Sequence, residues 1–339
     1  EMNKSIGIIG AGPGGMAAAE QLRKKGYQVM IYDKYDRPGG LLIYGIPNFK
    51  LEKYVVERRT QILKKSGIIF YQDFEVGKTK PFNYLKKKHD AILIATGVYK
   101  ARDLNIPGIK LSNIFPALDF LIASNRKGLG DSVPNFDNGR LNAKKKNVVV
   151  VGGGDTAMDC VRTAVRQGAK NVKCLYRRNR ENMPGSMREV LHAEEEGVEF
   201  KWLSVPINIF GNKQVDAIEV AKVKLGEPDA SGRESPKILA KDTFKLKADM
   251  VIKAIGFHPE PLPKLFNHPS LQVTKWGTIK IDHETMMTNQ PGIFAAGDIV
   301  RGAALVVWAI RDGRDAAKSI DNYLSKNINK EETKQFASL

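Results

Sequence analysis

The sequence predicts an α/β fold in which one strand–turn–helix–strand unit occurs twice. A glycine-rich turn follows an apolar run at Gly10–Gly15 and again at Gly152–Ala157. In both copies, sixteen positions separate the first glycine of the turn from the glycine that ends the helix, Gly26 or Gly168. Each such unit is half of a Rossmann fold, and 339 residues suffice for two domains. We therefore predict two Rossmann-like (three-layer ββα) dinucleotide-binding domains.

The first unit begins with an apolar strand at residues 5–9 and continues into a helix with an apolar face. The glycines of its turn have separate tasks: Gly10 makes the tight turn, Gly12 lets the backbone approach a pyrophosphate, and Gly15 lets helix and strand pack closely. The pyrophosphate would sit on the helix N-terminus, where backbone N–H groups are free.

The second unit repeats this order. An apolar strand at Val148–Val151 leads into Gly152-Gly153-Gly154-Asp155-Thr156-Ala157, a helix and a second strand at Val172–Tyr176. Ala157 takes the third position, where a small residue allows helix and strand to pack. Two such turns in one chain indicate two phosphate cradles.

The residue that ends the second strand distinguishes the two nucleotides. In the first unit this residue is Asp33, whose carboxylate accepts hydrogen bonds from ribose hydroxyls and repels a 2′-phosphate, so either FAD or NAD fits. In the second unit Arg177 and Arg178 follow the strand, and guanidinium groups pair with the 2′-phosphate of NADP(H). Two nicotinamides would have no chemistry to exchange, so we predict FAD in the first unit and NADPH in the second.

Later segments complete the two domains. The strands ending at Ala95-Thr96-Gly97 and at Ala296-Gly297-Asp298 are expected to join the first unit, together with a helix from about Ala303 to Leu324. The strand Asp249–Gly256 is expected to join the second. We therefore place the FAD domain at residues 1–100 and 290–339, with the NADPH domain inserted at 101–289 and a small antiparallel meander near 206–246.

Composition narrows the function. The two cysteines, Cys160 and Cys174, form no C-x-x-C, which disfavours a redox dithiol, a cysteine-ligated iron–sulfur cluster and a zinc site. Buried free thiols fit a cytoplasmic protein. The formal net charge of +17 comes largely from scattered lysines, and a lysine-rich proteome is its simplest explanation. Attraction of NADPH and of an acidic redox partner is the next explanation, and nucleic acid is the last. No apolar run reaches the ~18 residues of a membrane span.

The motifs resemble those of the small (β) subunit of NADPH-dependent glutamate synthase and related flavin reductases. The resemblance covers nearly the whole chain. Its most specific segments are residues 39–51, 152–159, 176–178, 182–186, 296–299 and 306–310. It implies that electrons pass from FAD to iron–sulfur clusters and on to a large subunit that makes glutamate. The family normally carries an N-terminal cysteine-rich domain; Glu1-Met2 suggests its removal, although Met2 could also be a true start.

The resemblance and the motifs together define the expected cofactor contacts. For FAD they are Gly10, Gly12, Pro13, Gly14, Asp33, Lys34, Gly40, Leu41, Leu42, Gly45, Ile46, Pro47, Ala95, Thr96, Gly97, Gly297, Asp298, Leu305 and Val306. For NADPH they are Gly152, Gly154, Asp155, Thr156, Ala157, Arg177, Arg178 and Gly256. Neither a catalytic side chain nor a metal ligand is expected, because the cofactors carry the chemistry.

These features predict a cytoplasmic NADPH-oxidising flavoprotein module of the glutamate synthase type. Its expected partner is the glutamate synthase large subunit or an iron–sulfur protein. A stand-alone reductase resembling ferredoxin-NADP reductases is the alternative. A non-catalytic flavin- or RNA-binding protein is a more remote one, favoured only by the charge.

Overall fold

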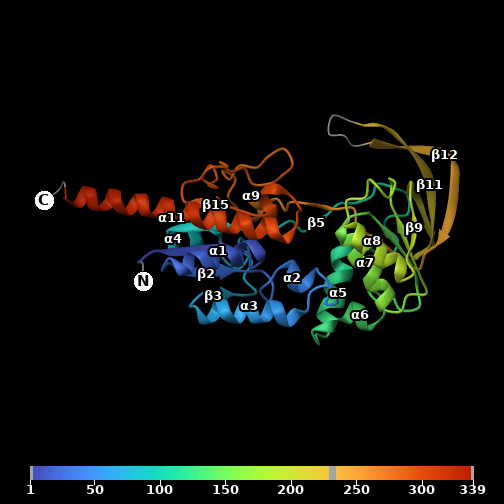
Figure 1. The fold of residues 1–339 in the computed structure, drawn as a ribbon, viewed down its shortest axis with the longest axis horizontal. Helices are drawn as coiled ribbons and strands as arrows, with labels where there is room; N and C mark the ends of the chain where they lie inside the picture. Colours follow the sequence, from blue (N-terminus) through green and yellow to red (C-terminus); the bar gives the residue numbers. More distant parts are fainter. Residues whose placement is uncertain (1–2, 229–233, 337–339) are drawn as a thin grey trace. The chain divides into compact units, whose positions relative to one another are not determined.

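The computed structural model describes residues 3–228 and 234–336. The chain divides into two compact units (Figure 1). Unit 1 comprises Glu1–Ile43, Leu51–Lys100 and Phe257–Leu339, and unit 2 comprises Tyr44–Lys50 and Ala101–Gly256. Short strands β5 (Lys100–Ala101) and β14 (Phe257–His258) pair where the chain passes from one unit to the other and back.

Unit 1 is built on a five-stranded parallel sheet in the order β15-β4-β1-β2-β3. Its strands are β1 (Ser5–Ile9), β2 (Gln28–Tyr32), β3 (Ile69–Tyr71), β4 (Ala91–Ile94) and β15 (Ile293–Ala295). The central strands are almost continuously apolar, as expected for strands covered on both faces.

Helices cover both faces of this sheet. They are α1 (Pro13–Lys24), α2 (Leu41–Tyr44, which runs into unit 2), α3 (Lys53–Lys65), α4 (Phe82–Lys88), α9 (Leu262–Leu265), α10 (Asp298–Arg301) and α11 (Val306–Phe336). One core contains residues of α1 and α11, and the other contains residues of α4 and α9. Helices α1 and α11 approach closely at Gly14 and Gly313, where a Cβ on Gly313 would lie 2.1 Å from the Gly14 carbonyl oxygen.

Unit 2 has the same sheet architecture, with parallel strands in the order β6-β13-β7-β8-β9. They are β6 (Ile114–Pro116), β13 (Met250–Lys253), β7 (Asn147–Val151), β8 (Asn171–Leu175) and β9 (Glu199–Lys201). The helices of unit 2 are α5 (Ala117–Gly128), α6 (Pro134–Asp137), α7 (Asp155–Arg166) and α8 (Met187–Glu195). The repeated unit is therefore visible as two α/β domains with matching central strands.

An antiparallel sheet packs against one face of the parallel sheet of unit 2. It consists of β10 (Ser204–Gly211), β11 (Val215–Pro228) and β12 (Glu234–Lys247), in that order. Its buried residues Ile218 and Val220 share a core with Val149 and Val251 of the parallel sheet. We call this sheet the meander.

The second domain boundary differs from the sequence expectation. The sequence predicts that residues 257–289 belong to the NADPH domain, whereas in the structure they pack with unit 1. Leu262, Phe266 and Ile279 are buried in one core with Phe82 and Ile94. This segment has little regular secondary structure, so hydrophobic periodicity could not assign it to a sheet.

Candidate functional site

A cavity of about 440 Å³ opens within unit 1 at the carboxyl ends of the central strands. Ligands of open α/β sheets bind at this edge, because the strand ends and the helix N-termini meet there. The lining includes these expected residues: Gly10, Gly12, Pro13, Gly14, Asp33, Lys34, Leu41, Ala95, Thr96, Gly97, Gly297, Asp298 and Val306. It also includes residues that the sequence analysis missed, among them Tyr35, Phe74, Tyr99, Glu260, Leu265 and Phe266.

The glycine turn of unit 1 has the geometry of a phosphate cradle. Gly10 has a φ of +108°, and a Cβ there would lie 2.3 Å from the Ala95 carbonyl oxygen. Gly12 instead faces open space: a Cβ there would meet no atom of the described chain within 4 Å. Gly40 lies against Gly12, since a Cβ on Gly40 would be 3.0 Å from the Gly12 Cα. The open position is therefore the one expected to face a pyrophosphate.

Asp33 stands beside this turn, and part of its carboxylate is already engaged. Its Oδ2 accepts the Ala11 N–H at 2.5 Å and its Oδ1 accepts the Tyr35 N–H at 2.8 Å. Burial raises the pKa of Asp33, and the two backbone N–H bonds oppose that rise. The carboxylate thus orders the turn in addition to lining the cavity.

Two buried polar atoms of the lining lack a protein partner. Thr96 Oγ1 and Asp298 Oδ1 have no hydrogen-bond partner among the described residues. Burial raises the pKa of Asp298 to about 6, although the Ala304 N–H and Arg301 act against it. Buried polar atoms are normally paired, so these two indicate a polar ligand in the cavity.

Tyrosines and one ion pair form another part of the cavity wall. The Lys34 ammonium lies 5.5 Å from the ring centroid of Tyr35 and 5.1 Å from that of Tyr99, and it pairs with Glu260 at 3.2 Å. Tyr35 directly follows Asp33-Lys34, and Tyr99 lies two residues after Gly97, so nearness to these motifs in the sequence was the available signal. Glu260 lies far from both motifs in the sequence, so no sequence signal marked it as a residue of the cavity wall.

Other expected FAD contacts lie outside this lining. Leu42 accepts a hydrogen bond from Lys53 through its carbonyl, and Leu305 is exposed. Gly45, Ile46 and Pro47 belong to unit 2, contrary to their assignment to the first domain. The cause is a long-range contact: the buried Asn125 amide donates to the Tyr44 carbonyl (2.9 Å) and the Gly45 carbonyl (3.2 Å). Their contact with FAD stays a prediction.

Unit 2 contains an equivalent cradle. Gly152 has a φ of +146°, with the Ala254 carbonyl oxygen 2.1 Å from a Cβ placed on it. A Cβ on Gly154 would meet no atom of the described chain within 4 Å, which matches Gly12. Helix α7 begins at Asp155, so Thr156 and Ala157 lie in its first turn. Gly256 follows β13 and lies near Arg102.

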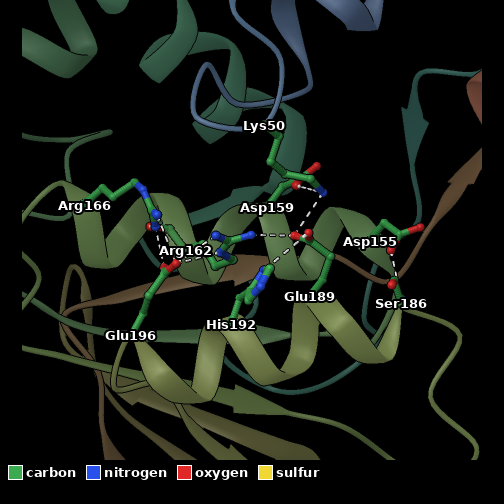
Figure 2. A network of polar contacts seen from close by, with 9 residues as sticks. All are labelled: Lys50, Asp155, Asp159, Arg162, Arg166, Ser186, Glu189, His192 and Glu196. Carbon is green, nitrogen blue, oxygen red and sulfur yellow. Dashed lines mark hydrogen bonds and ion pairs between the residues drawn. The ribbon is translucent and has the colours of Figure 1, made fainter.

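The loop after β8 folds back onto this cradle. The Gly185 N–H donates to the Gly153 carbonyl at 3.0 Å, and the Ser186 N–H donates to Asp155 Oδ1 at 3.1 Å (Figure 2). The Asp155 side chain, expected to contact the nucleotide, therefore accepts a backbone bond that holds this loop. We call residues 177–186 the cradle loop.

The two arginines take different environments at the start of the cradle loop. Arg177 is exposed, whereas Arg178 is half-buried. The Arg178 Nε donates to the Glu234 carbonyl at 2.9 Å. Strand β8, which precedes them, pairs with β7, which precedes the cradle. The sheet thus places the arginines beside the glycine turn.

A dense ionic network fixes residues 44–50, a segment we call the strap, to unit 2 (Figure 2). The Lys50 ammonium contacts Asp159 at 2.8 Å and Glu189 at 3.2 Å. Glu189 also pairs with the buried Arg162 at 2.7 Å. Arg162 and Arg166 bind Glu196, and their guanidinium groups stack on the Phe49 ring. The strap, which lies within the family-specific segment 39–51, is therefore anchored through Lys50 to α7 and α8.

Two α/β units with matching open glycine cradles define the class of two-domain dinucleotide-dependent oxidoreductases. The family model of the pyridine nucleotide-disulphide oxidoreductases matches residues 4–313. The glutamate synthase (NADPH) small chain of Azospirillum brasilense is 60% identical over 95% of this chain and 67% of its own length. The Escherichia coli K12 small chain is 43% identical over 96% and 69%. The chain belongs to the pyridine nucleotide-disulphide oxidoreductase family and, within it, to the glutamate synthase (NADPH) small chains.

Solved structures agree with this fold. FprA from Mycobacterium tuberculosis in complex with NADPH has a TM-score of 0.82 at 20% identity, covering 99% of this chain and 89% of its own. Lactococcus lactis thioredoxin reductase has a TM-score of 0.68 at 21% identity, covering 96% and 100%. The fold class and the family resemblance inferred from the motifs are confirmed. Among the described residues, no helix has the length and apolar character needed to cross a membrane.

Proposed function

We propose that this chain oxidises NADPH with FAD as its first electron acceptor, as the electron-entry module of a glutamate synthase. It is an NADPH-dependent oxidoreductase of the small-chain family. FAD held by the glycine turn and Asp33 of unit 1 would supply the redox chemistry, as a hydride acceptor that can also release single electrons. The protein supplies two binding sites, and the opposite charges at these sites determine which nucleotide each one binds.

FAD is proposed to occupy the cavity of unit 1. Gly12 would admit its pyrophosphate to the α1 N-terminus, and Asp33 would face the adenosine ribose. The unpaired Thr96 hydroxyl and Asp298 carboxyl would gain hydrogen bonds from the polar parts of the cofactor. The open space at Gly12 and the two unpaired polar atoms therefore fit bound FAD.

NADPH is proposed to bind the cradle of unit 2. Gly154 would admit its pyrophosphate to the α7 N-terminus, and Arg177 with Arg178 would bind its 2′-phosphate. The observation that carries the whole assignment is the contrast between the two cradles. Equivalent open turns are followed by a carboxylate in unit 1 and by two guanidinium groups in unit 2.

The acceptor is proposed to be an iron–sulfur centre that passes electrons to a glutamate synthase large subunit, in the cytoplasm. The small-chain relatives support a large-subunit partner through their names. The net charge of +17 suits a partner with an acidic surface.

The test is spectroscopic. The purified protein should be yellow, and NADPH should bleach it far faster than NADH under anaerobic conditions. The double variant R177A/R178A should raise the KM for NADPH by ~10–100-fold and leave NADH use nearly unchanged, because a bond to a charged group contributes about 1.5–3 kcal/mol. Colourless protein, or an equal loss with both nucleotides, would contradict the proposal.

A further inference from the structure

The meander reaches the start of the cradle loop through Glu234, the first residue of β12. The Glu234 carbonyl accepts the Arg178 Nε–H at 2.9 Å, and its Oε2 accepts the Asn182 amide at 2.8 Å. We infer that Glu234 is a positioning residue for 2′-phosphate recognition: it orients Arg178 and thereby sets the preference for a 2′-phosphorylated nucleotide. This inference rests on the proposed NADPH site.

The chemistry of arginine gives this contact its meaning. A guanidinium group has five N–H donors in a fixed plane and can present either its side, through Nε, or its end, through the two terminal nitrogens. Because Nε is engaged by Glu234, the end with both terminal nitrogens is left for a bidentate bond to a phosphate. The bond to the Glu234 carbonyl thus determines which edge of the Arg178 guanidinium group is available to a phosphate.

The Glu234 side chain fixes the position from which its carbonyl acts. Its carboxylate holds Asn182, whose amide also contacts Asn179 Oδ1 at 2.8 Å. The Asn182 carbonyl in turn accepts the Tyr176 hydroxyl at 2.8 Å, and the Tyr176 ring lies against Gly153 of the glycine turn. A chain of contacts therefore runs from β12 through the cradle loop to the phosphate cradle, all within unit 2.

The experiment compares two mononucleotide probes that differ by one phosphate. Isothermal titration of the flavin-loaded full chain measures binding of 2′,5′-ADP and of 5′-AMP. E234A should weaken 2′,5′-ADP by ~3–10-fold, the effect of one hydrogen bond, and change 5′-AMP less than twofold. E234Q keeps an oxygen acceptor for Asn182 and should restore wild-type selectivity. D242A, at an exposed position on the same strand, is the matched control and should change neither probe.

A second variant keeps the inference testable if E234A folds poorly. N182A should give the same selective loss, and the double variant should lose no more than either single variant, because both act on one contact chain. Full retention of the 2′,5′-ADP preference in E234A and N182A would overturn the positioning role while leaving the proposed function intact. Equal binding of the two probes by the wild-type protein would instead refute the NADPH assignment, and the inference with it.

Discussion

At the scale of single residues, the second glycine of each turn separates cofactor binding from folding. Gly12 has a φ of −75° and Gly154 a φ of −91°, values open to any residue, and neither position meets a neighbouring atom of the described chain. Gly10 is the opposite case, because its φ of +108° and its contact with Ala95 exclude a side chain. Gly10 and Gly12, two glycines of one turn, thus serve different purposes: Gly10 is required by the fold, and Gly12 leaves room for a ligand.

We therefore expect a matched pair of variants to remove one cofactor each. G12A should keep the thermal stability of the flavin-free wild type and lose flavin, since the added methyl fills the cradle. G154A should keep its flavin and lose affinity for 2′,5′-ADP and NADP+. Flavin absorbance, thermal unfolding and titration measure these effects, and G10A, which should unfold, is the control for steric damage. Full flavin content in G12A would contradict the cradle assignment.

Asp298 provides a prediction about pH. Burial raises its pKa from 3.8 to about 6, so the folded flavin-free protein binds this proton more tightly than the unfolded chain does. Stability contributed at this site is therefore present below pH 4 and lost as pH rises toward 6. D298N should remove that part of the pH dependence. Because Asp159 titrates in the same range, the measured quantity is the difference between wild type and variant in urea unfolding at pH 4 to 7. Parallel curves would exclude the effect.

At the scale of elements, the strap shows how a short segment is anchored to a helix. Burial raises the pKa of Asp159 to about 6, while Lys50 opposes the rise. K50M would leave the Asp159 carboxylate without its closest cation, and we expect unit 2 to lose ~1–3 kcal/mol at pH 8. The loss should be smaller at pH 5, where Asp159 can accept a proton and become neutral.

The control for the strap is charge removal on both sides. K50M/D159N should recover much of the stability lost in K50M, since no uncompensated charge remains. Urea unfolding followed by tryptophan fluorescence reports the change, with Trp202 as the probe within unit 2. An equal loss at pH 5 and pH 8 would show that the ion pair is not its origin.

At the scale of the whole molecule, two domains share one architecture through different chain routes. In each unit the strand that leads into the cradle is central, flanked by its βα partner on one side. In unit 1 the edge strand beside β4 is β15, which comes late in the chain. In unit 2 the edge strand beside β13 is β6, which comes early in the chain. The meander adds an element to unit 2 that unit 1 lacks among the described residues, and this element carries Glu234.

The sequence by itself determined the repeated unit, the two glycine turns and the charge contrast between Asp33 and Arg177-Arg178. These features are local: a turn that requires positive φ needs glycine, and a strand end selects its nucleotide through one or two adjacent side chains. The sequence also predicts the last helix, from about Ala303 to Leu324. In the structure this helix, α11, begins at Val306 and extends to Phe336.

Only the tertiary structure decided the place of residues 257–289, the anchoring of the strap and the contact of Glu234 with Arg178. Each depends on partners far apart in the chain: Phe266 on Phe82, Lys50 on Asp159, and Arg178 on Glu234. Apolar periodicity and motif spacing describe neighbours along the chain, whereas burial and charge pairing are settled among segments that meet only after folding.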